Sequence, residues 1–180
     1  DALPISSWKS GQQVQYLETA DINLGGQQNV YLVFKSYYMQ NQDNMGALEY
    51  SVDGGTTWFP VVIYLDAPDI VRNAQGQVDA PATLRLDSQS GITPAALLKP
   101  EGHLKSKDRI DAHPEEFARA IKAQYNDDWN YGKAVEYFRL EQADGQPSVR
   151  LRFVNTGTDS WHWWIDDLGF YSLAQPPNTP

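Results

Sequence analysis

The feature that most constrains the fold of this chain is a period-two alternation of apolar and polar residues in several separate segments. In the segment 29–38, "NVYLVFKSYY", Val30, Leu32 and Phe34 fall on one face of an extended strand. The same pattern recurs in the segments 47–52, 58–65, 137–142, 148–155 and 161–173. A strand with one apolar face needs a second sheet to cover that face. The pattern therefore predicts an all-β fold, a β-sandwich of two antiparallel sheets.

The turn residues between these segments predict which strands pair. Gly54 and Gly55 favour a hairpin of 47–52 with 58–65, and 29–38 would pair with 47–52 as a second hairpin. The Asp-Gly dipeptide in "ADGQP" predicts another hairpin between the segments that flank it. The aromatic segment "WHWWIDDLGFYSL" near the C-terminus predicts a final strand pair.

The segment 66–132 differs from the rest, because strand alternation is lost there and prolines and glycines are scattered through it. Phe117, Ile121 and Tyr125 recur in this segment at four-residue steps, which predicts a short amphipathic helix over about 114–126. A connection of this length exceeds that of ordinary loops. We therefore expect an ordered, partly helical insertion that packs on the sheets or over a binding face.

Composition limits the domain organisation and the class of partner. A chain of 180 residues suits one core, so we expect one domain over 1–173 and a tail or linker over 174–180. The formal net charge of −9 disfavours nucleic acid as a partner, and no apolar run reaches the roughly 20 residues of a bilayer span. The absence of cysteine excludes disulfides. Because the chain starts at Asp1 without a signal pattern, we expect that a leader was removed or that a longer protein was cut.

The stretch "SVDGGTTWFP" could be a reactive site or a turn. Ser51, Asp53, Gly55, Thr57 and Trp58 fit the pattern S-x-D-x-G-x-T-W. The Asp53 carboxylate can accept backbone N–H bonds, the glycines allow positive φ, and Trp58 can pack against its own sheet. The pattern resembles the Asp-box motif of sialidases and other extracellular β proteins, in which the motif is structural and lies away from the active site. We therefore expect a structural turn, with contact to a ligand as the alternative.

Three stretches at the two ends of the chain carry a further signal, namely "ETADINLGGQQNVYLVFKSYY", "LEYSVDGGTTW" and "SWHWWIDDLGFYSL". Together they resemble bacterial relatives of MAM domains and the cleaved-adhesin modules attached to secreted proteases. The resemblance implies a jelly-roll β-sandwich and a secreted, non-catalytic recognition module, extracellular or at the bacterial cell surface. It also implies a calcium ion near the strand that holds Asp166 and Asp167, and it says nothing about the insertion.

Two aromatic clusters are candidates for ligand binding. In "SWHWWIDDL", alternation places Trp163 and Trp164 on opposite faces, so Trp164 lies outside if Trp163 is in the core. The second cluster, in "YNDDWNYG", combines carboxylates with aromatic rings: Asp127, Asp128, Trp129 and Tyr131. Aromatic rings offer stacking surfaces to sugars and Asp side chains bind hydroxyls, so both clusters suit carbohydrate. The alternative for each cluster is packing, in the core, under the insertion or against the sheet.

Four carboxylates are candidates for a calcium site. Asp166 and Asp167 supply hard oxygen ligands of the kind that calcium binds. Glu18 and Asp21 would join them if the two ends of the chain pair. Such an ion would stabilise the fold rather than take part in a reaction. The alternative is that Asp166 and Asp167 accept hydrogen bonds from loop backbone amides.

Catalytic signatures are missing from the sequence. The histidines His103, His113 and His162 share no zinc-binding spacing, and there is neither a G-x-S-x-G motif nor a phosphate-binding glycine loop. We therefore expect no enzyme activity, and a paired-carboxylate glycoside hydrolase is the least favoured alternative. The sequence predicts a module that binds an extracellular glycan or a surface protein. A structural or adhesion spacer domain of a larger extracellular protein is the second hypothesis.

Overall fold

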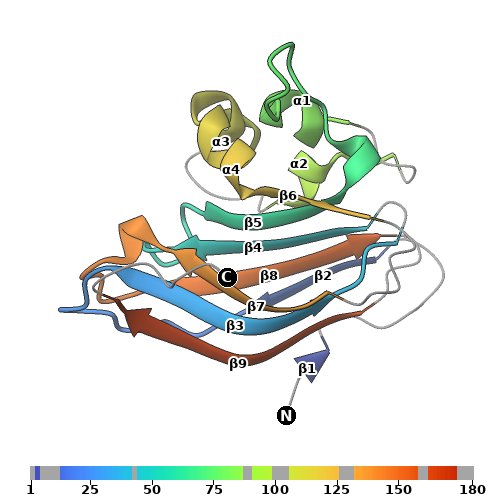
Figure 1. The fold of residues 1–180 in the computed structure, drawn as a ribbon. Helices are drawn as coiled ribbons and strands as arrows, with labels where there is room; N and C mark the ends of the chain where they lie inside the picture. The colour runs from blue at the N-terminus through green and yellow to red at the C-terminus, as the bar shows by residue number, and fades with distance from the viewer. Residues whose placement is uncertain are drawn as a thin grey trace.

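Two β-sheets stacked face to face form the centre of the molecule, and short helices cover one of them (Figure 1). This computed structural model describes residues 3–4, 13–41, 44–86, 91–98, 106–125, 132–157 and 162–173. The strands are β1 (Leu3–Pro4), β2 (Gln13–Glu18), β3 (Val30–Tyr38), β4 (Met45–Ser51), β5 (Phe59–Asp66), β6 (Ile121–Gln124), β7 (Gly132–Arg139), β8 (Arg150–Gly157) and β9 (Trp163–Ser172). The architecture is therefore sandwich-like, as the alternating pattern predicts.

Sheet A has the strand order β1-β9-β3-β7, and sheet B has the order β2-β8-β4-β5-β6. Among the described strands, neighbours pair antiparallel except β5 and β6, which are parallel. The helices are α1 (Ala80–Leu84), α2 (Pro94–Leu97), α3 (Ser106–Ala112) and α4 (Pro114–Ala120), with 3-10 turns η1 (Ala67–Asp69) and η2 (Glu141–Ala143). In the part of the chain that the structure describes, no helix is long and apolar enough to cross a membrane.

The predicted hairpins are correct for one strand pair and wrong for two. β4 and β5 form the expected hairpin, but β3 lies in the other sheet from β4, and β7 lies in the other sheet from β8. The turn after β7 bonds to the chain next to β3, because the Asp144 carboxylate accepts from the Val30 N–H at 2.9 Å and Gly145 N–H donates to the Gln27 carbonyl at 2.8 Å. A hairpin and a crossing between sheets use the same turn residues, so the sequence alone did not separate them.

The predicted final strand pair is also wrong, because β9 is one continuous strand that pairs along β3. The register between them shifts between Val33 and Lys35. Asp167, on the opposite strand, has a left-handed φ of 51° at this point. The irregularity takes up one extra residue without ending the strand.

The core between the sheets is centred on Trp163, which is fully buried. The rings of Tyr38, Tyr64 and Phe153 meet its indole edge to face, with centroids 5.6, 5.6 and 5.5 Å away. The indole N–H donates to Ser36 Oγ at 3.1 Å, so its polar atom is satisfied. Because Trp163 points inward, its neighbour in the strand must point outward.

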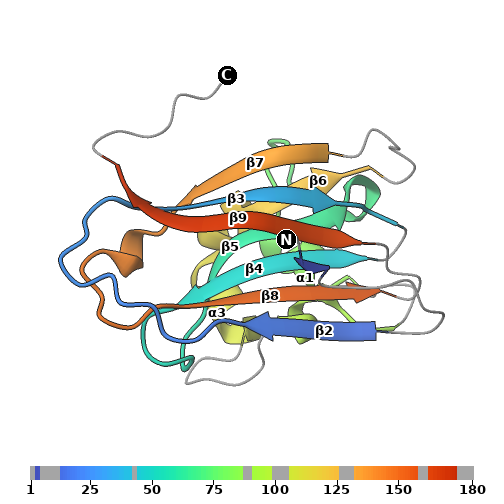
Figure 2. The same cartoon turned by 90° about the horizontal axis from the view of Figure 1, so that it is seen from below.

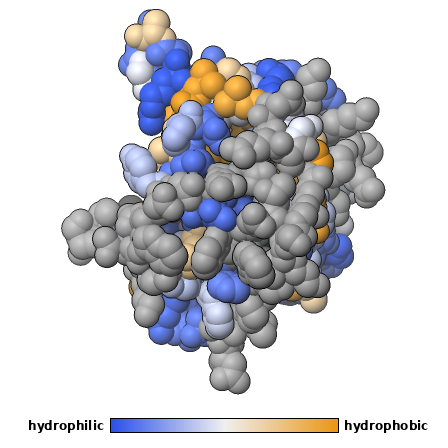
Figure 3. Space-filling view, turned by 90° about the vertical axis from the view of Figure 1, so that its right-hand side faces the viewer, coloured by the Kyte–Doolittle hydropathy of each residue, from blue (hydrophilic) through white to orange (hydrophobic). Residues whose placement is uncertain are grey.

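A second core lies between sheet B and the described part of the insertion. Met45, Ala47 and Ile63 on the outward face of sheet B contact Leu84 and Phe117 of the helices in one buried cluster. Since sheet A covers the other face, every residue of β4 is buried. Seen from the side, the insertion shows a hydrophobic patch bordered by hydrophilic residues (Figure 3).

The helix predicted over about 114–126 is shorter than expected. α4 ends at Ala120, where Ile121 turns to an extended conformation, and Ile121–Gln124 forms β6 alongside Ile63–Asp66 of β5. The free edge of β5 offers hydrogen bonds to this segment, and the β-branched Ile121 suits a strand. Tyr125, which the helical pattern places on the apolar stripe, is instead 67% exposed.

A buried ion pair lies on the outward face of sheet B. The Arg152 guanidinium is 2.8 Å from the Glu49 carboxylate, and each side chain is only 3% exposed. The rings of Tyr16 and Trp58 flank the guanidinium carbon, with centroids 4.7 and 5.1 Å away. Tyr16 Oη in turn donates to the Leu97 carbonyl of the insertion at 3.1 Å. Glu49 and Arg152 are thus two charges on a largely apolar face that the insertion covers.

We predict that Arg152→Met lowers the free energy of unfolding by about 3–5 kcal/mol, because it leaves the buried Glu49 carboxylate without its cation. The double variant Glu49→Leu/Arg152→Met should lose much less, since neither charge then remains buried. Urea unfolding of the wild type, both single variants and the double variant measures this difference. Additive losses in the double variant would contradict the prediction.

Candidate functional site

The outward face of sheet A carries exposed aromatic side chains. None of the described helices or strands lies over this face, whereas the insertion covers sheet B (Figures 1 and 2). The open face is formed by outward-pointing side chains of β3, β7 and β9, which include Tyr31, Val33, Lys35, Tyr37, Val135, Tyr137, Arg139, Trp164, Asp166 and Tyr171. Val135 is 61% exposed, Tyr171 50% and Trp164 38%. This surface is available to a partner as far as the described residues show.

Strand register arranges the open face in layers. Tyr37 lies opposite Trp164, Lys35 lies opposite Asp166, and Tyr31 lies opposite Tyr171. Aromatic residues therefore mark both ends of the face and charged groups lie between them. A shallow hollow of about 580 Å³ lies beside Trp164, lined by Lys35, Ser36, Tyr37, Ala134, Val135, Trp164 and Asp166.

Trp164 is on the side of sheet A that faces away from the insertion. Trp163 fills the core position, and the insertion packs on sheet B. Trp164 therefore packs neither in the core nor under the insertion. The His162 ring meets the Trp164 ring at a centroid distance of 6.1 Å and an interplanar angle of 74°, which leaves the indole partly exposed. The role of Trp164 in ligand binding stays a prediction.

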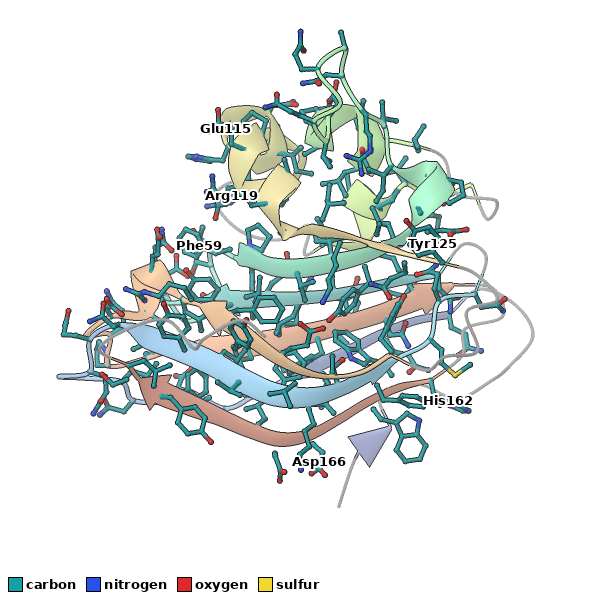
Figure 4. The ribbon with its side chains drawn as sticks, viewed as in Figure 1. Phe59, Glu115, Arg119, Tyr125, His162 and Asp166 are labelled. Carbon is teal, nitrogen blue, oxygen red and sulfur yellow. The ribbon has the colours of Figure 1, made fainter. Side chains whose placement is uncertain are left out.

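The charged groups of the open face form a local network. Lys35 Nζ contacts the Asp167 carboxylate, and this hydrogen bond holds the pKa of Asp167 below its usual range and raises the pKa of Lys35. The Asp167 N–H donates to Asp166 Oδ1 at 2.9 Å. Figure 4 shows Asp166 pointing away from the two sheets. One cation and two carboxylates thus occupy the middle of the face.

The four carboxylates proposed for calcium do not meet in the structure. Glu18 ends β2 and Asp21 contacts Arg150, both at the edge of sheet B, whereas Asp166 and Asp167 lie on β9 in sheet A. The expectation assumed that β2 pairs with the last strand, but β2 pairs with β8 and β1 pairs with β9. Within the described ranges no group of three or more His, Asp or Glu side chains could hold a metal ion. A calcium ion stays a prediction.

The second aromatic cluster falls outside the described residues. Asp127, Asp128, Trp129 and Tyr131 belong to the range 126–131, so their role stays a prediction.

The stretch "SVDGGTTWFP" forms the turn between β4 and β5. The Asp53 Oδ1 atom accepts the backbone N–H groups of Thr57 at 2.8 Å and Thr56 at 3.0 Å, and the Ser51 hydroxyl at 2.8 Å. Burial alone would raise the pKa of Asp53, but the hydrogen bonds from Thr57, Ser51 and Thr56 outweigh it and hold this pKa below the ordinary 3.8. The carboxylate is therefore engaged with its own loop.

The remaining residues of this turn also bond locally. Gly55 has a φ of 90° and its N–H donates to Ser51 Oγ at 2.9 Å, while Trp58 Nε1 donates to the Gly55 carbonyl at 2.9 Å. Trp58 is only 5% exposed and stacks on Arg152. Each side chain of the motif thus has a partner inside the fold.

A second hollow, of about 650 Å³, lies between α4 and the end of β7, and sequence reasoning missed it. His113, Glu115 and Arg119 line one wall, and Glu141 and Gln142 of η2 line the other. Figure 4 labels Glu115 and Arg119, which belong to the α4 wall of this hollow. The charges at α4 are visible in "HPEEFARA", but the opposite wall comes from a distant segment. The walls carry both signs of charge and favour no ligand class.

Comparison with known proteins assigns this chain to no family. The chain matches no protein-family model, and no curated protein matches it significantly.

We predict that Asp53→Ala lowers the free energy of unfolding at neutral pH by about 1 kcal/mol, the typical cost of losing an acceptor for backbone N–H groups. Because the folded pKa is depressed, the contribution of Asp53 is present above its ordinary pKa and is lost as the pH falls below 3.8. Chemical unfolding at pH 7 and at acidic pH should show the difference between wild type and variant shrink in acid.

The matched control is Asp53→Asn, whose amide oxygen can accept the same bonds without titrating. It should lose less stability than Asp53→Ala, with no change in its own contribution across this pH range. A difference between wild type and Asp53→Ala that is constant with pH would show that the carboxylate charge is not what holds the turn.

Proposed function

We propose that this protein is a secreted, non-catalytic recognition module that binds extracellular glycans through the open face of sheet A. The observation that carries the proposal is the exposed Trp164 ring beside a hollow that also contains Lys35 and Asp166. An aromatic ring offers an apolar surface to the C–H face of a sugar, and charged and polar groups bind its hydroxyls. A site with a few polar groups on an otherwise apolar surface has the composition expected for such a ligand.

We further propose a jelly-roll topology for the sandwich. Four antiparallel pairs are nested in the chain, with β4–β5 innermost, then β3–β7, β2–β8 and β1–β9 outermost. Successive pairs alternate between the two sheets. A long hairpin wrapped on itself in this way gives the strand order of a jelly roll, with β6 added at one edge. This order supports the fold that the resemblance to MAM-like and cleaved-adhesin-like modules implies.

The second candidate function is a structural or adhesion spacer in a larger extracellular protein. It is favoured by the apolar part of the open face, where Val135 is 61% exposed. Apolar side chains on an exposed sheet can contact a neighbouring domain or a surface protein. A glycoside hydrolase remains the least favoured function, and release of soluble sugar from polysaccharide would reveal it.

We predict that the purified chain binds one class of glycan on a broad array, and that Trp164→Ala weakens this binding on the order of tenfold or more, as for a central aromatic anchor. The control is Leu17→Ala, which removes a side chain that is 43% exposed on β2 of sheet B. This control should bind like wild type.

Running the array with calcium and with a chelator tests the proposed ion at the same time. Loss of binding in the chelator would place calcium in or beside the site, and equal binding would remove it from the recognition function. If no glycan binds in either condition, the glycan proposal fails and the spacer function becomes the account to test.

A further inference from the structure

We propose that the open face binds an uncharged oligosaccharide chain laid along the strands, with Trp164 and Tyr171 as two separate stacking platforms. This inference rests on the proposed glycan-binding function and adds to it the length, direction and charge of the ligand. Of these two residues the sequence pattern singles out only Trp164, and Tyr171 is identified by its position in the structure.

The Tyr171 ring lies along the sheet rather than standing away from it. A Cβ atom added to Gly169 would be 3.0 Å from Tyr171 Cε2, 3.3 Å from Cζ and 3.2 Å from Oη. The ring therefore folds back over the backbone of the glycine two residues earlier. At the same time Tyr171 is 50% exposed. An aromatic ring resting on a bare stretch of backbone and open to solvent is positioned to stack on a flat ligand.

The two platforms are too far apart for one sugar ring to contact both. Trp164 lies opposite Tyr37, and Gly169, beneath the Tyr171 ring, lies opposite Val33. Four residues of β3 separate these two positions, which corresponds to roughly 13 Å along the strand. A ligand that contacts both platforms must therefore be a chain of several sugars running parallel to β3 and β9.

The groups between the platforms favour an uncharged chain. Lys35 and Asp167 neutralise one another, and Asp166 keeps one carboxylate oxygen beyond the one that accepts the Asp167 N–H. The middle of the face therefore offers an ammonium donor and carboxylate acceptors to hydroxyls, with an excess of negative charge. The chain as a whole carries a formal net charge of −9. Arg139, on the same face, is paired with Asp144. Uronic or sialic acid polymers would therefore meet repulsion from the carboxylates in the middle of the face and from the whole protein.

The test is calorimetric titration of the full chain with defined oligosaccharides, from monosaccharide to hexasaccharide. The neutral probes are β-1,4-glucan, β-1,4-xylan and β-1,3-glucan oligomers, and the anionic probe is oligogalacturonate. We expect the hexasaccharide of one neutral series to bind roughly tenfold or more tightly than its disaccharide, because the second platform adds a tethered contact. Tyr171→Ala should remove this gain and leave disaccharide binding at the Trp164 platform unchanged.

Gly169→Ala is a second variant that keeps the tyrosine but displaces its ring. The Gly169 backbone is outside the left-handed region, so alanine is tolerated by the backbone, and its new Cβ would press on the Tyr171 ring. It should weaken hexasaccharide binding in the same way as Tyr171→Ala, and combining the two should add nothing further. Leu17→Ala serves again as the control, with unchanged binding to every probe.

The outcomes separate this inference from the function on which it rests. If neutral sugars bind through Trp164 with the same affinity at every length, or if Tyr171→Ala has no effect, glycan binding stands and the two-platform arrangement is overturned. Tighter binding of oligogalacturonate overturns the inferred neutral ligand. If none of the oligosaccharides binds and the array is also negative, the glycan-binding function and this inference both fail.

Discussion

The central strands of sheet B, β4, β5 and β8, are largely buried on both faces, and much of the molecule follows from this constraint. One face packs on sheet A and the other packs on the insertion, so that β4 is buried along its whole length. Polar groups on the outward face have no water to bind and must pair, as Glu49 and Arg152 do. Because the insertion occupies this face, the outward side of sheet A is the broad sheet surface that the described elements leave open.

The sequence predicted the strands better than their partners. Alternation placed Val30, Leu32 and Phe34 in the core correctly, because the period-two pattern depends only on one strand and the side it buries. Pairing depends on where the chain crosses between sheets, and no local pattern records that. The failure at Ile121 has the same origin, since the edge of β5 converted the end of a helical pattern into a strand. In both cases, the strand pairing and the end of α4, contacts with residues distant in sequence determine the structure.

The candidate site was likewise predictable only in part. The opposite orientations of Trp163 and Trp164 follow from alternation and from the need to bury one of two adjacent indoles. The position of Tyr171 on Gly169, and the distance of that ring from Trp164, require the register of β9 against β3. The carboxylates proposed for calcium do not meet for the same reason, because Glu18 lies on β2, which pairs with β8 and not with β9.

The nested strand pairing also has a consequence for how the chain folds. β4 and β5 meet across a turn of a few residues, whereas β3–β7 and β2–β8 join segments progressively farther apart in sequence. Each wider loop costs more chain entropy to close, and domains dominated by distant contacts fold on the order of milliseconds to seconds. We therefore expect folding to start at the hairpin that contains Asp53, because it closes the shortest loop. On the same ground we expect the outer strands to join last, and unpaired sheet edges are open to aggregation until they do.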